Sequence, residues 1–240
     1  FALPGGFIGV HSGLILAAQS ESELAGVLAH EISHVTQRHI ARGLSKASQS
    51  QAASWVAIAV AILAARNNAD VAHGAMVAGM AGSASQQLKF SRDFEREADR
   101  VGLQVLERSG YDVRGMGAFF ERLQRSSRLY ENNAPGYLLT HPLTVERISD
   151  MENRIQLRPY RQVADSLDFL LVRAKLRAQE GPIPEAIAEF ETQVRERKFS
   201  SEIAAHYGLA IALWRAKDYA RADVQIAELR RLKAVSYMVE

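Results

Sequence analysis

The chain has 240 residues, of which 48% are hydrophobic, and this is enough to fill the core of one large domain or of two modest ones. Its 29 basic and 27 acidic side chains give a net charge of +2 without any block of like charges, so nucleic acid is not indicated as a partner. Because cysteine is absent, disulfide frameworks, thiolate catalysis and cysteine-type zinc sites are excluded, and His, Asp and Glu remain as the plausible metal ligands.

The first 18 residues, FALPGGFIGVHSGLILAA, combine apolar runs with glycines at positions 5, 6 and 13. This pattern predicts a strand, a turn and a second strand, or a strand that leads into a helix. Because the chain starts at Phe1 inside this element, we expect an N-terminal part of the domain to be missing, and a signal peptide can be neither seen nor excluded. An edge strand from Phe7 to His11 would align an extended substrate by strand addition, although a purely structural strand fits the pattern equally well.

A helix is predicted from Ser20, because Glu23 follows three residues later in a capping box and apolar residues then recur at helical spacing. The stretch LAHEISHVTQRH lies inside this helix. Gly43 is the expected stop, and the polar SKASQSQ after it reads as a loop.

Two apolar runs follow, at residues 52–65 and 71–84, with polar residues between them. Each has fourteen residues, short of the roughly 20 that a spanning helix needs. Small residues at Gly74, Ala78 and Gly82 would let another helix approach closely. The runs predict a buried or lid-like helical hairpin, and the alternative is peripheral membrane contact through residues 52–84.

The next predicted helix spans residues 86–108 and ends at Gly110, a left-handed cap position, after which Asp112 can cap a further helix. A loop rich in turn formers is expected across residues 132–148. From about Asp165 the chain becomes Ala-rich and helical. We therefore predict a catalytic domain at residues 1–160 and a helical domain at residues 165–240.

The second domain contains an internal repeat with a constant offset of 36 residues, which pairs Ala174 with Ala210, Ala186 with Ala222, and Phe190 with Ile226. Small residues at fixed points on paired helices resemble tetratricopeptide repeats, whose period is about 34. The alternative is an ordinary Ala-rich hairpin duplicated by chance. A true repeat would be a binding module.

The chemistry of the chain is concentrated in the HExxH motif at His30 to His34. Residues four apart lie one above the other on a helix, so both imidazoles can reach one ion. Glu31 sits about 100° round the helix, close enough to a metal-bound water to take its proton without ligating the metal. The metzincin variant would need Gly and His where the chain has Gln37 and Ile40, and His39 is therefore predicted to be a helix-surface residue.

Glu95 and Asp99, in SRDFEREADRVG, share a helix face at the same four-residue spacing. One carboxylate can ligate the metal while the other accepts the Nδ1–H of a ligating His. The alternative is a solvated helix face on which the acidic side chains Glu95, Glu97 and Asp99 pair with the basic Arg92, Arg96 and Arg100.

Three motifs together resemble one peptidase family: HExxH in a helix, then EREAD followed by RVG in a later helix, then a His-Pro pair followed by an Arg in THPLTVERI. The order is similar to that of the gluzincin family that contains the CAAX prenyl endopeptidase and the heat-shock membrane peptidase HtpX. With GGFIGVHSGLI and the tetratricopeptide-like tail, nearly the whole chain resembles the BepA-type peptidases of the bacterial periplasm. The long spanning helices of the membrane-embedded relatives are not found in the sequence, so prenylated substrates are not indicated.

The resemblance implies one zinc ion per chain, held by His30, His34 and Glu95. Glu31 is then the general base, and Asp99 accepts a hydrogen bond from a ligating His. His141, in the His-Pro segment, is expected near the zinc, where it either stabilises the oxyanion or caps the metal as a fourth ligand in a latent state. Arg147 is a weaker candidate, for holding the His141 loop or for binding substrate.

The expected fold is α+β but mainly helical: a gluzincin-type metallopeptidase domain with a small sheet, followed by TPR-like helical hairpins. The resemblance implies a zinc metalloendopeptidase of the periplasm that hydrolyses misfolded or misassembled envelope proteins, with the repeats recruiting substrates or the outer-membrane assembly machinery. The alternative is a chaperone or adaptor for outer-membrane protein assembly with a latent, self-capped zinc site.

Overall fold

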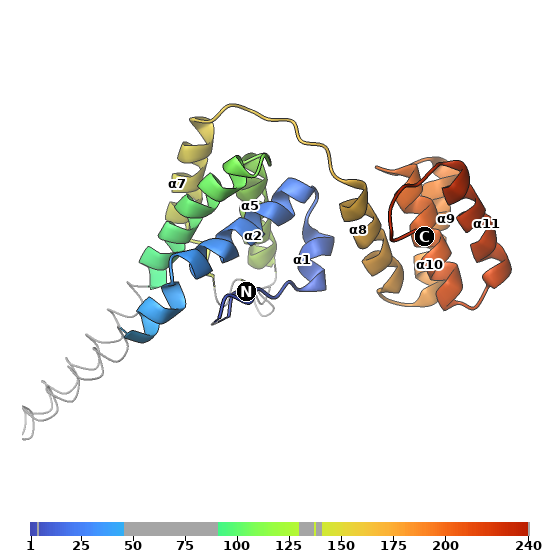
Figure 1. The fold of residues 1–240 in the computed structure, drawn as a ribbon, viewed down its shortest axis with the longest axis horizontal. Coiled ribbons are helices and arrows are strands. Elements are labelled where there is room, and N and C mark those ends of the chain that lie inside the picture. Colours follow the sequence, from blue (N-terminus) through green and yellow to red (C-terminus); the bar gives the residue numbers. More distant parts are fainter. Residues whose placement is uncertain (4, 46–90, 130–136, 138–140, 240) are drawn as a thin grey trace, which may run out of the picture. The chain divides into compact units, whose positions relative to one another are not determined.

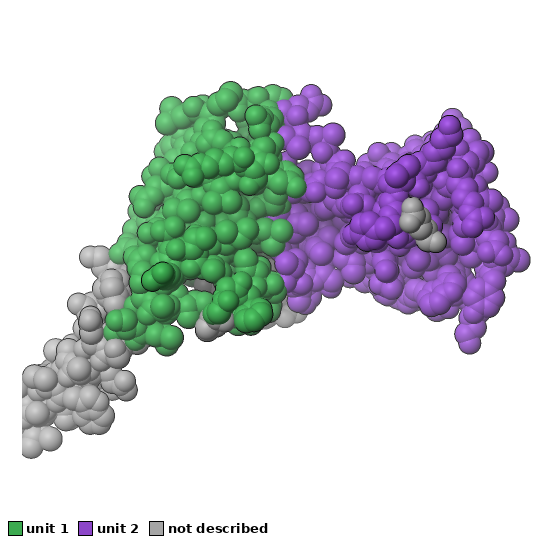
Figure 2. Space-filling model, viewed as in Figure 1, with its two compact units in different colours: residues 1–9, 25–161 green, residues 10–24, 162–240 purple. Residues whose placement is uncertain are grey.

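The computed structural model describes residues 1–3, 5–45, 91–129, 137 and 141–239 (Figure 1). The predicted hairpin of the two apolar runs, at 52–84, lies outside the described residues. Contacts divide the chain into two compact units, one formed by residues 1–9 and 25–161 and the other by residues 10–24 and 162–240 (Figure 2). No helix within the described residues has the length and hydrophobicity needed to cross a bilayer.

The N-terminal segment forms a tight turn and a short helix, and the predicted small sheet is wrong for the described part of the chain. Gly5 and Gly6, with φ of 92° and 86°, fold the backbone so that Ala2 and Ile8 make one antiparallel bridge. A single bridge without a third strand does not build a sheet. The predicted edge strand to His11 is also wrong, because the His11 side chain caps helix α1 (Ser12–Ala17) by accepting the Gly13 N–H.

Helix α2 (Glu21–Thr36) carries the HExxH motif and begins where the capping signal predicts. The Ser20 hydroxyl accepts the N–H of Glu23 at 3.3 Å, and the Glu23 carboxylate accepts the N–H of Gln19 at 2.6 Å. Side chains therefore accept these two backbone N–H groups at the start of the helix. The predicted start of this helix is confirmed.

The end of α2 differs from the prediction of one helix that stops at Gly43. The chain leaves α2 after Thr36, passes through Gln37 and Arg38, and starts a second helix at residues 39–45 that continues past Gly43. Arg38 has a φ of 55°, in the left-handed region that non-glycine residues rarely occupy. This break changes the direction in which the residues after it point.

The first unit contains most of α2, helix 91–108, α5 (Arg114–Leu129) and α7 (Val145–Gln156), and α5 contacts α7. Gly110, at φ 85°, follows helix 91–108 as predicted, and Asp112 accepts the N–H of Arg114 at the start of α5. The predicted loop ends earlier than expected, because Thr144 caps α7. The fully buried side chains of the core include Val27, Leu103, Leu106, Met116, Phe120 and Met151.

The second unit contains two helical hairpins, formed by α8 (Leu167–Gln179) with α9 (Ile183–Glu196) and by α10 (Glu202–Arg215) with α11 (Tyr219–Arg231). Helix α10 contacts the other three. The four alanines that the repeat alignment pairs are all buried: Ala174, Ala186, Ala210 and Ala222. Gly208 lets α10 pack closely, since a Cβ at this position would overlap the ring of Phe190.

Candidate metal centre

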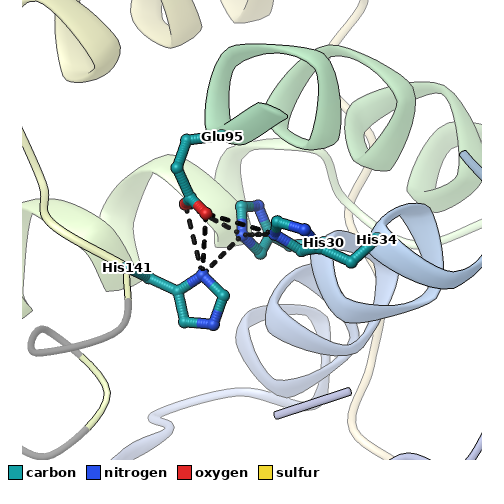
Figure 3. A group of neighbouring side chains, drawn as sticks. All are labelled: His30, His34, Glu95 and His141. Carbon is teal, nitrogen blue, oxygen red and sulfur yellow. Dashed lines mark hydrogen bonds and ion pairs between the residues drawn. The ribbon is translucent and has the colours of Figure 1, made fainter. Parts of the chain in front are cut away.

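Helix α2 presents His30 and His34 on one face, as the four-residue spacing predicts. Their Nε2 atoms lie 3.0 Å apart, and both side chains are buried. Their rings meet edge to face, with 4.7 Å between the centroids. The two nitrogens therefore point into one small volume (Figure 3).

Helix 91–108 brings Glu95 to the same volume. Its Oε2 lies 3.4 Å from Nε2 of His30, and its Oε1 lies 3.4 Å from Nε2 of His34. The helix approaches α2 closely because Gly102 has no side chain: a Cβ there would lie 3.2 Å from the Cα of His30. The predicted partner helix thus supplies a carboxylate within reach of both histidines.

His141, from the segment that precedes α7, completes the cluster. Its Nδ1 lies 3.1 and 3.2 Å from the two Glu95 oxygens and 3.4 Å from Nε2 of His30. The ring of Tyr137 stacks on the His141 ring, with 4.6 Å between the centroids. His30, His34, Glu95 and His141 each offer one ligand atom, and these atoms lie within 4.8 Å of one another (Figure 3).

The donor set fits a divalent transition metal. Nδ1 of His30 lies 3.0 Å from Oδ1 of Asp99, and this contact orients the ring so that Nε2 faces the cluster. Imidazole nitrogens with a carboxylate are the ligands that zinc and similar ions accept in proteins.

Arg147, at the start of α7, links the cluster to its surroundings. Its Nε and Nη2 donate to the two oxygens of Asp99, each at 2.8 Å. Its Nη1 lies 2.9 Å from Oε2 of Glu95 and donates to the carbonyl of Pro142 at 2.7 Å. This buried guanidinium therefore contacts both acidic residues and the segment that carries His141, where the loop-holding hypothesis requires it.

Glu31 lies beside the cluster without joining the ligand set. Its side chain is buried, and neither carboxylate oxygen accepts a hydrogen bond from the described residues. Its Oε1 lies 3.4 Å from Nε2 of His141. A buried carboxylate with no hydrogen-bond donor is costly, so an unused oxygen at this position indicates a chemical task.

Three side chains of the cluster have strongly shifted pKa values. Burial lowers the pKa of His30, but its contacts with Asp99 and Glu95 outweigh burial and raise that pKa to about 9. Burial and the charge on His30 lower the pKa of His34 to about 3. Burial opposes ionisation of Glu95, yet its contacts with His141 and His30 bring its pKa well below the usual range. These shifts favour a protonated His30 and an ionised Glu95, so a cation that binds Nε2 of His30 would displace a proton.

The predicted surface position of His39 is wrong, because its side chain is 3% exposed. Its Nδ1 lies 2.9 Å from Nδ1 of His34, and its Nε2 lies 3.1 Å from Oε2 of Glu97. The alternative of a solvated acidic face is also wrong, since Glu95 and Asp99 point into the cluster and Glu97 pairs with Arg42. The one signal for His39 in the sequence was its nearness to the motif.

Comparison with known proteins places the chain in a family. The model of peptidase family M48 matches residues 1–155. The chain belongs to peptidase family M48. The family predicted from the three motifs is thereby confirmed, and the cluster of three histidines and Glu95 is the candidate metal centre of this member.

Proteins with similar sequences come from bacteria, a plant and yeasts. A protein of Vibrio cholerae serotype O1 is 39% identical over 232 residues, which cover 95% of this chain and 48% of that protein. The beta-barrel assembly-enhancing protease of Escherichia coli K12 is 37% identical over 221 residues, or 91% of this chain and 45% of the relative. The mitochondrial metalloendopeptidase OMA1 of Arabidopsis thaliana is 34% identical over 142 residues, 59% of this chain and 26% of that protein. The chain spans about half the length of the bacterial relatives.

Proposed function

We propose that the protein is a zinc endopeptidase in which His30, His34 and Glu95 hold one zinc ion. The observation that carries this proposal is the buried cluster of inward-facing donor atoms in a chain of family M48. When bound, zinc lowers the pKa of a water molecule toward 7 and polarises the scissile carbonyl.

Glu31 acts as the general base in this proposal. A carboxylate oxygen without a hydrogen-bond donor can accept the proton of the attacking water and pass it to the leaving amine as the C–N bond breaks. Asp99 holds the Nδ1 proton of His30, and Arg147 fixes Asp99 and Glu95 in place. The buried surroundings keep these charges at fixed positions, where they act more strongly than in water.

His141 serves as a cap in the proposed resting state, so the metallopeptidase and the latent zinc site are two states of one protein. Its Nδ1 is 3.1 Å from Glu95 and belongs to the same set of ligand atoms. A fourth protein ligand in this position would exclude the attacking water. Substrate access then requires the His141 segment to move away.

His141→Ala is therefore expected to raise the rate of peptide cleavage, by roughly tenfold if about one chain in ten is open at rest. The measurement is kcat/KM on an unfolded protein substrate, with His206→Ala in the second unit as the matched control. A fall in kcat would assign His141 to turnover, and an unchanged rate would remove it from the site.

The proposed substrates are misfolded or misassembled envelope proteins, and the proposed location is the periplasm. The names of the bacterial relatives support a role in beta-barrel assembly, and we propose that the barrels are outer-membrane proteins. The two hairpins of the second unit, proposed to be TPR-like repeats, would bind substrates or the assembly machinery.

A cavity of about 300 Å³ between α8, α9 and α10 offers a surface for such contacts. Charged, polar and apolar side chains line it, among them Arg173, Arg177, Glu189, Phe190 and Gln193. An adaptor role would use the same surface, and residues 52–84 remain a proposed peripheral membrane contact.

Metal removal tests the central proposal. We expect one zinc ion per purified chain, loss of cleavage of unfolded casein after dialysis against a chelator, and recovery on adding one equivalent of zinc but not of magnesium. Zinc content is measured by atomic absorption and cleavage by gel densitometry. Cleavage that persists in the chelated, metal-free chain would contradict a metal-dependent reaction.

A further inference from the structure

A break in the helix places His39 beside the candidate metal centre. In a straight helix, the residue five positions after His34 would lie about 140° away round the axis and point elsewhere. The break at Gln37 and Arg38 turns the chain so that the His39 ring faces back to the His34 ring, with 4.9 Å between the centroids. Arg38 adopts a φ of 55° to make this turn, a conformation that costs a non-glycine residue free energy.

Neighbouring side chains hold both the turn and the ring. Phe94 stacks on His39 with 4.7 Å between the centroids and an interplanar angle of 14°. The guanidinium of Arg42 lies 4.8 Å from the centre of the Phe94 ring, and its Nη1 donates to the carbonyl of Gln37 at 3.2 Å. The same Nη1 donates to Oε2 of Glu97 at 2.8 Å. Arg42 therefore holds in place both the turn at Gln37 and the Glu97 carboxylate that contacts His39.

The contacts form a chain of donors and acceptors with one consistent arrangement of protons. If Nε2 of His34 offers its lone pair to the metal, its proton sits on Nδ1 and is donated to Nδ1 of His39 at 2.9 Å. Neutral His39 then carries its own proton on Nε2, where it donates to Glu97 at 3.1 Å. Glu97 remains an acceptor because Arg42 is bound to it.

We propose that His39 is a positioning residue of the metal centre, which fixes the tautomer and orientation of His34 and transmits to it the basicity of Glu97. Asp99 plays the corresponding part for His30, because its Oδ1 lies directly against Nδ1 of that ring. The two histidines of HExxH thus each have a carboxylate behind them, one in direct contact and one through an intervening imidazole. This inference rests on the proposed zinc site.

The test is the zinc affinity of the whole chain, measured by competition with a chromophoric chelator. His39→Leu removes the acceptor and should weaken zinc binding by about tenfold to a hundredfold, the range found when partners of ligating histidines are lost. His39→Asn places an amide oxygen where Nδ1 was and should stay within about threefold of the parent. His206→Leu, the same change at a buried His of the second unit, should leave affinity unchanged.

Comparing His39→Asn with one further variant, His39→Gln, keeps the test independent of whether His39→Leu folds. His39→Gln puts its oxygen nearer the position of Nε2, so it should bind zinc more weakly than His39→Asn. Equal affinities of the Asn and Gln variants, or parental affinity in folded His39→Leu, would overturn the role of His39 alone. A parent chain that binds no zinc would instead overturn the proposed zinc site.

Discussion

Glu31→Gln is expected to lower kcat by about 10²- to 10⁴-fold, the contribution of a positioned general base, while zinc content stays at one per chain. The amide has the size of the carboxylate but cannot accept the proton of the attacking water. Because Glu31 lies outside the set of ligand atoms, its replacement leaves the metal site intact. Single-turnover cleavage of a fluorogenic peptide and zinc analysis of the same sample measure the two effects together.

The matched control for this prediction is Glu146→Gln. It makes the same chemical change on an exposed side chain that pairs with Arg96 at the surface. We expect its rate to stay within about twofold of the parent, because exposed ion pairs contribute little. If Glu31→Gln cleaves at the parental rate with full zinc content, another group must take the proton.

The part of the centre that follows helical periodicity could be predicted from the sequence. His30 with His34, and Glu95 with Asp99, share faces because each pair is four residues apart, and the structure brings the two faces together. Spacing alone could not show which carboxylate ligates. The position of the carboxylates depends on the close approach of helix 91–108 to α2 at Gly102. The residue pattern of a single helix does not show how closely it approaches a second one.

His39 was missed for a different physical reason. Its placement depends on a left-handed residue at Arg38, and Arg carries no local signal for that conformation, unlike Gly or Asn. The N-terminal strands were predicted because the apolar runs and glycines of the first 18 residues fit two strands joined by a turn as well as a strand that leads into a helix. In the structure, the His11 side chain caps α1, and the residues that follow it are helical. His141 and Arg147 came from the family resemblance, since no spacing links them to His30.

Arg147→Ala is expected to destabilise the folded chain by about 3–5 kcal/mol, because it leaves buried carboxylates without their cation. Arg147 is 3% exposed and makes close contacts with Asp99, Glu95 and the Pro142 carbonyl, so water cannot replace it without opening the site. Arg147→Lys keeps the charge but loses the bidentate contact with Asp99. Its free energy of unfolding should therefore lie between those of the parent and of Arg147→Ala. The free energy of unfolding is measured by urea titration of zinc-loaded chains.

Arg154→Ala, on the same helix α7, supplies the comparison that separates burial from charge. Arg154 pairs with Asp150 at 2.8 Å, but both side chains are at least 40% exposed. Its loss should change the free energy of unfolding by under about 0.5 kcal/mol. Because Arg147 also orients Glu95, its removal should weaken zinc binding by about tenfold or more, whereas Arg154→Ala should not. Equal effects of the two substitutions would mean that Arg147 acts as a surface charge and that the site is held by its histidines alone.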